Sequence, residues 1–180
     1  MEKKVGKAEI SLVTDDITLM DVDAFVFYAR PDLKLGSGYG NAISVRGGTA
    51  IQEELDKIGS ADVGEAVVTS AGKLRARHII HAVGPAFQEQ DSEIKLEKTT
   101  RSVIEKAEEL EAGKLALPPM GSGFYGIAPD VCARVLLGVL GDHLSGETSL
   151  RHVYLCLPDG RDMTPFQKHL AALQPKGATR

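Results

Sequence analysis

The chain has 180 residues, a net charge of -4 and 43% hydrophobic residues, which fits one globular domain and excludes disordered and collagen-like proteins. The negative charge argues against a nucleic-acid binder that depends on bulk positive charge. Cys132 and Cys156 are too few for a disulfide framework, so we expect a cytoplasmic protein. Both lie in apolar runs, which favours buried thiols over nucleophiles.

Short β-rich runs and one amphipathic segment make up the N-terminal half. Residues 1–7 contain three lysines and no apolar run long enough for a signal peptide. The run Ala24–Tyr28 is apolar throughout, which predicts a strand buried on both faces in the middle of an α/β sheet. The expected elements are strands at Ala8–Val13, Asp23–Tyr28, Glu65–Ser70 and His78–Val83, and a helix at Gly47–Ile58.

Helices and strands alternate in the C-terminal half. The expected elements are helices at Ser92–Leu110, Pro129–Leu144 and Thr164–Leu173, and strands at Lys114–Leu117 and His152–Leu157. The polar end, Gln174–Arg180, is expected to be a frayed tail. No stretch approaches the roughly 20 apolar residues of a membrane span. We therefore predict one three-layer α/β/α domain over residues 1–180, with its core at about 8–173 and a mixed, mostly parallel sheet.

Two glycine clusters follow predicted strands and precede predicted helices: Gly36–Gly40 and Gly121–Gly126. Open α/β sheets bind ligands at the carboxyl ends of their strands. Such loops offer unpaired backbone N–H groups and the positive end of a helix dipole, which together bind phosphate without a lysine. Two facing loops could hold a pyrophosphate, although glycines can also serve only to allow tight turns.

Other motifs give weaker indications of function. The second glycine cluster matches G-x-G-x-x-G, but Pro118-Pro119 interrupts its approach and it lies late in the chain, which argues against a nicotinamide or flavin enzyme. His78 and His81 lie on one predicted strand without a metal-ligand spacing and are interpreted as core or edge histidines. Neither Ser37 nor Ser122 lies in a G-x-S-x-G elbow. We expect no metal and no cofactor.

Five ordered blocks carry a family resemblance. They are Thr14–Thr18 with Val22–Val26, Leu33–Ile43, Ala66–Gly72, His78–Pro85 and Ala116–Gly126. In this order and spacing they resemble the macro domain, a module that binds ADP-ribose, over about residues 8–170. The resemblance implies the macro-domain fold and ADP-ribose as ligand.

The resemblance also implies site residues. Asp16 would accept a hydrogen bond from the adenine amine, with the Ile17 N–H facing a ring nitrogen, although Asp16 could instead be a turn or cap residue. Phe124 or Tyr125 could cover the distal ribose or lie in the core. Leu157-Pro158 stand where the family often stacks an aromatic residue on adenine. The residues expected around the diphosphate and distal ribose are Ser37, Gly38, Tyr39, Gly40, Gly121, Ser122, Gly123, Phe124 and Tyr125.

The chain departs from the family pattern at two places. The family's N-A-A-N is Phe27-Tyr28-Ala29-Arg30 here, so Arg30 replaces the asparagine that orients the distal ribose. Arg30 is either a new ligand group or a solvated loop arginine. Hydrolytic members carry an aspartate that aligns with Gly40, and glycine cannot polarise water. Hydrolysis by that route is therefore doubtful, while a route through the ligand's own phosphate stays open.

The resulting hypothesis is a binder of ADP-ribose, free or attached to protein. One alternative is a hydrolase of ADP-ribosyl or O-acetyl-ADP-ribose esters, and another is a binder of poly(ADP-ribose) or RNA. We expect no membrane partner, and the sequence predicts no oligomeric state.

Overall fold

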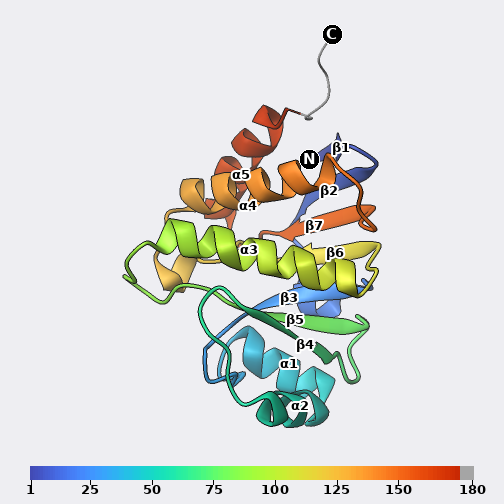
Figure 1. Cartoon of the computed structure of the whole chain (residues 1–180), viewed down its shortest axis with the longest axis vertical. Coiled ribbons are helices and arrows are strands. Elements are labelled where there is room, and N and C mark those ends of the chain that lie inside the picture. The colour runs from blue at the N-terminus through green and yellow to red at the C-terminus, as the bar shows by residue number, and fades with distance from the viewer. Residues whose placement is uncertain (175–180) are drawn as a thin grey trace.

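The computed structural model describes residues 1–174, and they form one seven-stranded sheet in the order β1-β2-β7-β6-β3-β5-β4 (Figure 1). The five inner strands run parallel, and β1 and β4 pair antiparallel at the two edges. The predicted mixed, mostly parallel sheet is thus confirmed. The strands are β1 Glu2–Val5, β2 Ala8–Val13, β3 Ala24–Ala29, β4 Ala66–Ser70, β5 His78–Val83, β6 Lys114–Leu117 and β7 His152–Cys156.

Helices cover both faces of the sheet. The helices are α1 Tyr39–Gly47, α2 Ala50–Ile58, α3 Ser92–Glu109, α4 Pro129–Leu144 and α5 Gly160–Ala172, with short 3-10 turns η1 Ile17–Leu19 and η2 Gly123–Tyr125. Buried hydrophobic residues form two core clusters. The first, which includes Val103, Leu137 and Phe166, joins one sheet face to α3, α4 and α5. The second, which includes Ile17, Ile43 and Ile51, joins the other face to η1, α1 and α2. Among residues 1–174, no helix is both long and apolar enough to cross a membrane. The expected tail lies almost wholly outside the described residues.

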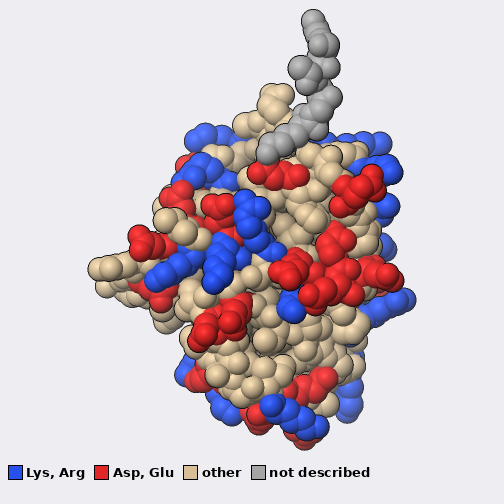
Figure 2. All heavy atoms as spheres, viewed as in Figure 1, with Lys and Arg blue, Asp and Glu red and all other residues tan. Residues whose placement is uncertain are grey.

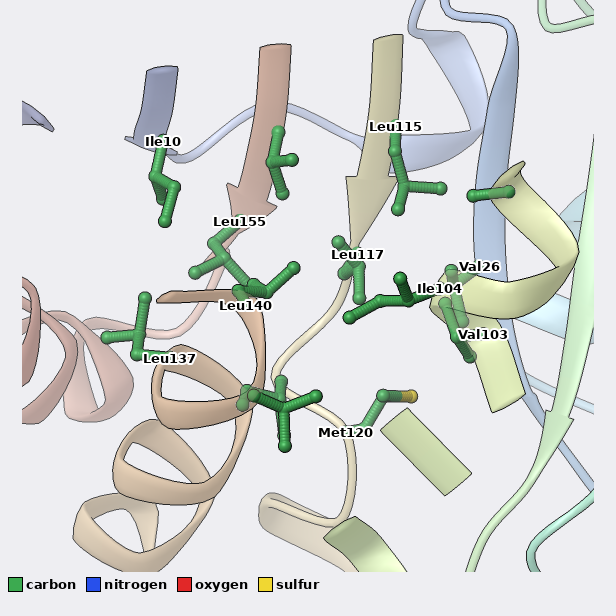
Figure 3. Close-up of a cluster of buried hydrophobic side chains, with 14 of the residues drawn as sticks. Ile10, Val26, Val103, Ile104, Leu115, Leu117, Met120, Leu137, Leu140 and Leu155 are labelled. Carbon is green, nitrogen blue, oxygen red and sulfur yellow. The ribbon is translucent and has the colours of Figure 1, made fainter. Parts of the chain in front are cut away.

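The core forms because alternate strand residues point into each helical layer. Figure 3 shows Ile10, Leu155 and Leu117 from neighbouring strands facing Leu137 and Leu140 of α4. Both cysteines are buried, Cys132 in the first core cluster and Cys156 in the second, with 0% and 1% exposure. Burial raises the pKa of both thiols to about 12. The interpretation of both as buried thiols is confirmed.

Three elements differ from the sequence-based expectation. Strand β1 was not predicted, because Glu2-Lys3-Lys4 is charged and the strand pairs on one side only. The helix expected at Gly47–Ile58 is α2, preceded by a separate α1, and Gly48 at φ 89° separates the two. Helix α5 begins at Gly160, four residues early, because the Asp159 side chain caps it by accepting from Arg161 N.

Candidate ligand-binding cleft

A cleft of about 450 Å³ opens where β3 ends. Its walls come from η1, the end of β3, the segment before α1, and η2. We call residues 36–40 the first glycine loop and residues 121–126 the second glycine loop. The two loops follow β3 and β6, which are adjacent parallel strands, so the topology brings them to opposite sides of one crevice.

One end of the cleft is built around Asp16, which caps η1. Asp16 Oδ1 accepts from Thr18 N at 2.9 Å and from Thr18 Oγ1 at 2.7 Å, and Oδ2 accepts from Arg46 Nη1 at 2.8 Å. Burial alone would raise the pKa of Asp16, but the bonds from Arg46 and Thr18 hold that pKa below its ordinary value. Asp16 is therefore a charged cap residue beside the cleft.

The first glycine loop presents unpaired backbone donors. Gly36 and Gly38 have φ of 68° and 62°, and Gly38 precedes α1 without a side-chain cap. Within residues 1–174, the N–H groups of Ser37, Gly38 and Tyr39 donate to no protein acceptor. These N–H groups lie at the positive end of the α1 dipole, which is the arrangement that binds anions.

Gly40, by contrast, lies inside α1 and is buried. A Cβ built on it would lie 1.7 Å from the Leu35 carbonyl oxygen. No side chain fits at this position unless the backbone moves, so the chain has no room for the aspartate that the family resemblance places here in hydrolytic members.

A hydrogen bond to α5 anchors the second glycine loop. Ser122 Oγ donates to Asp162 Oδ1 at 2.6 Å, and Asp162 is 5% exposed in the first turn of α5. The Tyr125 ring packs on Tyr28 at a centroid distance of 4.4 Å. Phe124 is 86% exposed and meets the Tyr125 ring edge-on. Phe124 is therefore a rim residue and not part of the core.

Tyr28 supports this end of the cleft. Its hydroxyl donates to the Pro85 carbonyl at 2.5 Å, and its ring occupies the space beside Gly84, where a Cβ would lie 2.4 Å from the ring. Burial raises the pKa of Tyr28 well above its ordinary value. Arg30 lies at the same end, paired with Asp32 at 2.7 Å, and its side chain is 59% exposed. Arg30 is thus a solvent-facing arginine that also lines the cleft.

The predicted site residues divide into two groups. Those that line the cleft are Ile17, Arg30, Ser37, Gly38, Tyr39, Phe124 and Tyr125. Those outside its lining are Asp16, Gly40, Gly121, Ser122, Gly123, Leu157 and Pro158. Leu157 is 1% exposed and packs in the first core cluster, so its side chain offers no surface to the cleft. Pro158 is exposed.

Tyr28 lines the cleft and Arg46 bonds to Asp16, but neither was predicted as a site residue. Tyr28 lies between Phe27 and Arg30, which replace the two asparagines of the family pattern. An aromatic residue at this place was the available sequence signal for a site residue. Arg46 gave no signal, because it reaches Asp16 only after α1 folds against η1, across a separation of 30 residues.

His81 does not contribute to the cleft. It is fully buried, its Nε2 bonds to Thr69 Oγ1 at 2.8 Å, and burial lowers its pKa to about 3. The interpretation of His81 as a core histidine is confirmed. No group of three or more His, Cys, Asp or Glu within residues 1–174 is placed to hold a metal ion.

Comparison with known proteins decides the family. The profile of the Macro domain matches residues 29–136. The chain belongs to the macro domain family. A Macro domain-containing protein of Caldanaerobacter subterraneus subsp. tengcongensis is 34% identical, covering 90% of this chain and 95% of the relative. A protein of Saccharolobus solfataricus is 41% identical over 87% of this chain and 89% of its own.

Solved macro domains share the fold. The Oceanobacillus iheyensis macrodomain with ADP superposes with a TM-score of 0.90 at 24% identity, covering 96% of this chain and 95% of that one. The Trypanosoma brucei macrodomain in complex with ADP-ribose superposes with a TM-score of 0.82 at 23% identity, covering 88% of this chain and 68% of that one. The resemblance stated from the sequence is thereby confirmed.

Proposed function

We propose that this macro domain binds ADP-ribose, free or attached to a protein, with adenine beside η1 and the diphosphate between the two glycine loops. The observation that carries the proposal is the set of unpaired N–H groups of Ser37, Gly38 and Tyr39 at the start of α1. They supply anion donors without a positive side chain, in a protein whose net charge is -4. ADP and ADP-ribose complexes of proteins with the same fold support this ligand.

Asp16 supports the adenine assignment. An ionised carboxylate offers about four acceptor positions. Thr18 takes two of them, both on Oδ1, and Arg46 takes one on Oδ2. One position on Oδ2 is left for an exocyclic amine. Because its pKa is held low, Asp16 is ionised at neutral pH and can only accept hydrogen bonds.

The titratable side chains that line the cleft favour binding over hydrolysis. They are Arg30 and three tyrosines, Tyr28, Tyr39 and Tyr125, and burial raises the pKa of each phenol. General base catalysis works best when the pKa of the base lies near the working pH. A hydrolase would therefore depend on the phosphate of the ligand itself, and release of ADP-ribose from an ester is the outcome that would show it.

The charge pattern bears on the polymer and RNA alternatives. Figure 2 shows acidic and basic side chains interspersed over the face that carries α3 and α4 in Figure 1, with acidic groups gathered near the end of α3. A binder that follows a long phosphate backbone needs a continuous basic groove. The lining of the cleft contains one Lys or Arg, Arg30, so we favour one ADP-ribose unit as the ligand.

Calorimetric titration of ADP-ribose into the wild-type protein and Asp16→Ala tests the proposal. We expect saturable binding by the wild type and at least a tenfold loss in the variant. Incubation with an ADP-ribosylated protein and with O-acetyl-ADP-ribose tests the alternative activity. Unchanged affinity in Asp16→Ala would reject the adenine assignment, and release of ADP-ribose would place the protein among the hydrolases.

A further inference from the structure

Arg46 closes a three-residue hydrogen-bonded ring at the edge of the cleft. Its Nη1 donates to Asp16 Oδ2 at 2.8 Å and to Thr18 Oγ1 at 2.5 Å. Thr18 Oγ1 in turn donates to Asp16 Oδ1 at 2.7 Å. Each of the three side chains therefore fixes the orientation of the other two.

The ring joins two elements that are distant in sequence. Asp16 and Thr18 belong to η1, whereas Arg46 lies in the last turn of α1. The Asp16 and Arg46 side chains are 33% and 42% exposed. Both lie outside the lining of the cleft, and Thr18, which lines it, connects the ring to the cleft. A surface ion pair of this kind adds little to folding stability. Its larger effect is to fix the plane of the carboxylate.

From this geometry we infer that Arg46 is a positioning residue that sets the base selectivity of the cleft by orienting Asp16. The inference rests on the proposed binding of ADP-ribose. Without Arg46, Thr18 still holds Oδ1, but Oδ2 loses its only protein donor among the described residues and the carboxylate can rotate. A 6-amino purine then loses a fixed acceptor, and a 6-oxo purine is rejected less strongly.

Discrimination follows from the chemistry of the purine edge. Adenine presents an amine donor at position 6, whereas hypoxanthine presents a carbonyl acceptor there. An ionised carboxylate accepts from the first and repels the second. The ratio of the two affinities therefore reports on carboxylate orientation and is insensitive to the general loss of a positive charge near a diphosphate.

The test is calorimetric titration of ADP-ribose and inosine diphosphate ribose into wild type, Arg46→Met and Arg46→Lys. Arg101→Met is the matched control, because Arg101 pairs with Glu97 on the outside of α3. We expect the wild type and the control to prefer ADP-ribose by about tenfold or more. The preference should fall to about threefold or less in Arg46→Met and recover in part in Arg46→Lys, with thermal stability nearly unchanged.

The outcomes separate the inference from the function on which it rests. Failure of the wild type to bind ADP-ribose would overturn the proposed function and the inference with it. Binding with an unchanged preference in Arg46→Met would overturn the inference alone. An equal loss of affinity for both ligands in Arg46→Met would also overturn it, because Arg46 would then act on the diphosphate through its charge.

Discussion

The Leu35 carbonyl oxygen occupies the space in which a Gly40 side chain would begin. A Cβ at Gly40 would lie 1.7 Å from that oxygen, and Gly40 is buried in the first turn of α1. Hydrolytic macro domains are expected to carry an aspartate at this position. The glycine here is therefore a packing requirement, and a point substitution cannot restore the aspartate.

Gly40→Asp should lower the free energy of unfolding by about 3 kcal/mol and should not create hydrolase activity, because the backbone of α1 must shift to admit the side chain. Urea unfolding measures the loss. Gly138→Ala is the control: it lies in α4 with no atom within 4 Å of the added Cβ, and should stabilise by about 0.5–1 kcal/mol. Ester hydrolysis by a stably folded Gly40→Asp protein would contradict this account.

Tyr28 should support both the fold and the ligand. Tyr28→Ala removes a ring packed on Tyr125 and Gly84, so we expect a loss of about 3 kcal/mol in stability and weaker ADP-ribose binding. Tyr28→Phe removes only the bond to the Pro85 carbonyl and should cost about 1 kcal/mol with affinity nearly kept. Equal affinity in Tyr28→Ala and wild type would show that Tyr125 needs no support from Tyr28.

Ser122→Ala should loosen the second glycine loop. The Asp162 carboxylate is 5% exposed and would lose the Ser122 hydroxyl, at a cost of about 2 kcal/mol. We expect ADP-ribose to bind several-fold more weakly, because the loop would no longer be fixed to α5. Substitution of the exposed Ser60 by alanine is the control for stability. A Ser122→Ala protein as stable as that control would refute the anchoring role.

Glu108 should make the fold sensitive to acid. Burial alone would raise its pKa, but bonds from Thr148, His143 and Ser149 outweigh this and lower the pKa from 4.5 to about 2. A folded-state pKa below the unfolded value means that this stabilisation is present above pH 4.5 and is lost as the pH falls towards 2. At 28% side-chain exposure we expect it to amount to about 2 kcal/mol.

Urea unfolding of wild type and Glu108→Gln at several pH values measures this contribution. Other carboxylates with lowered pKa values, such as Asp16 and Asp159, contribute to acid sensitivity in both proteins. The difference in stability between wild type and variant should therefore shrink as the pH falls from 4.5 towards 2. A difference that stays constant over this range would show that Glu108 contributes no acid sensitivity.

Most of the fold could be predicted because the buried strands and the long helices carry strong hydrophobic patterns. Ala24–Tyr28 is apolar throughout, and the predicted helix at Pro129–Leu144 has the bounds of α4. The misses have local causes: β1 is a charged edge strand, and α1 contains glycines and small polar residues that hide its periodicity. Helix α1 also begins at Tyr39, inside the glycine cluster that the sequence indicates to be a loop.

The candidate site could be predicted only where it is local in sequence. The first glycine loop and Asp16 follow from short motifs, and the structure places Ser37 and Gly38 in the lining of the cleft. Contacts between elements could not be predicted from the sequence. Neither the Arg46 bond to Asp16 nor the Ser122 bond to Asp162 has a sequence signature, because each depends on the packing of a helix against a loop.

The most direct test of the central claim is a calorimetric comparison of ADP-ribose, ADP and AMP on the wild-type protein. If adenine lies beside η1, the diphosphate between the glycine loops and the distal ribose under Tyr125, each added group should strengthen binding. We predict ADP-ribose to bind at least tenfold more tightly than AMP, with ADP between them. Equal affinities for ADP-ribose and AMP would contradict the account, because the second phosphate and the distal ribose would then contribute nothing to binding.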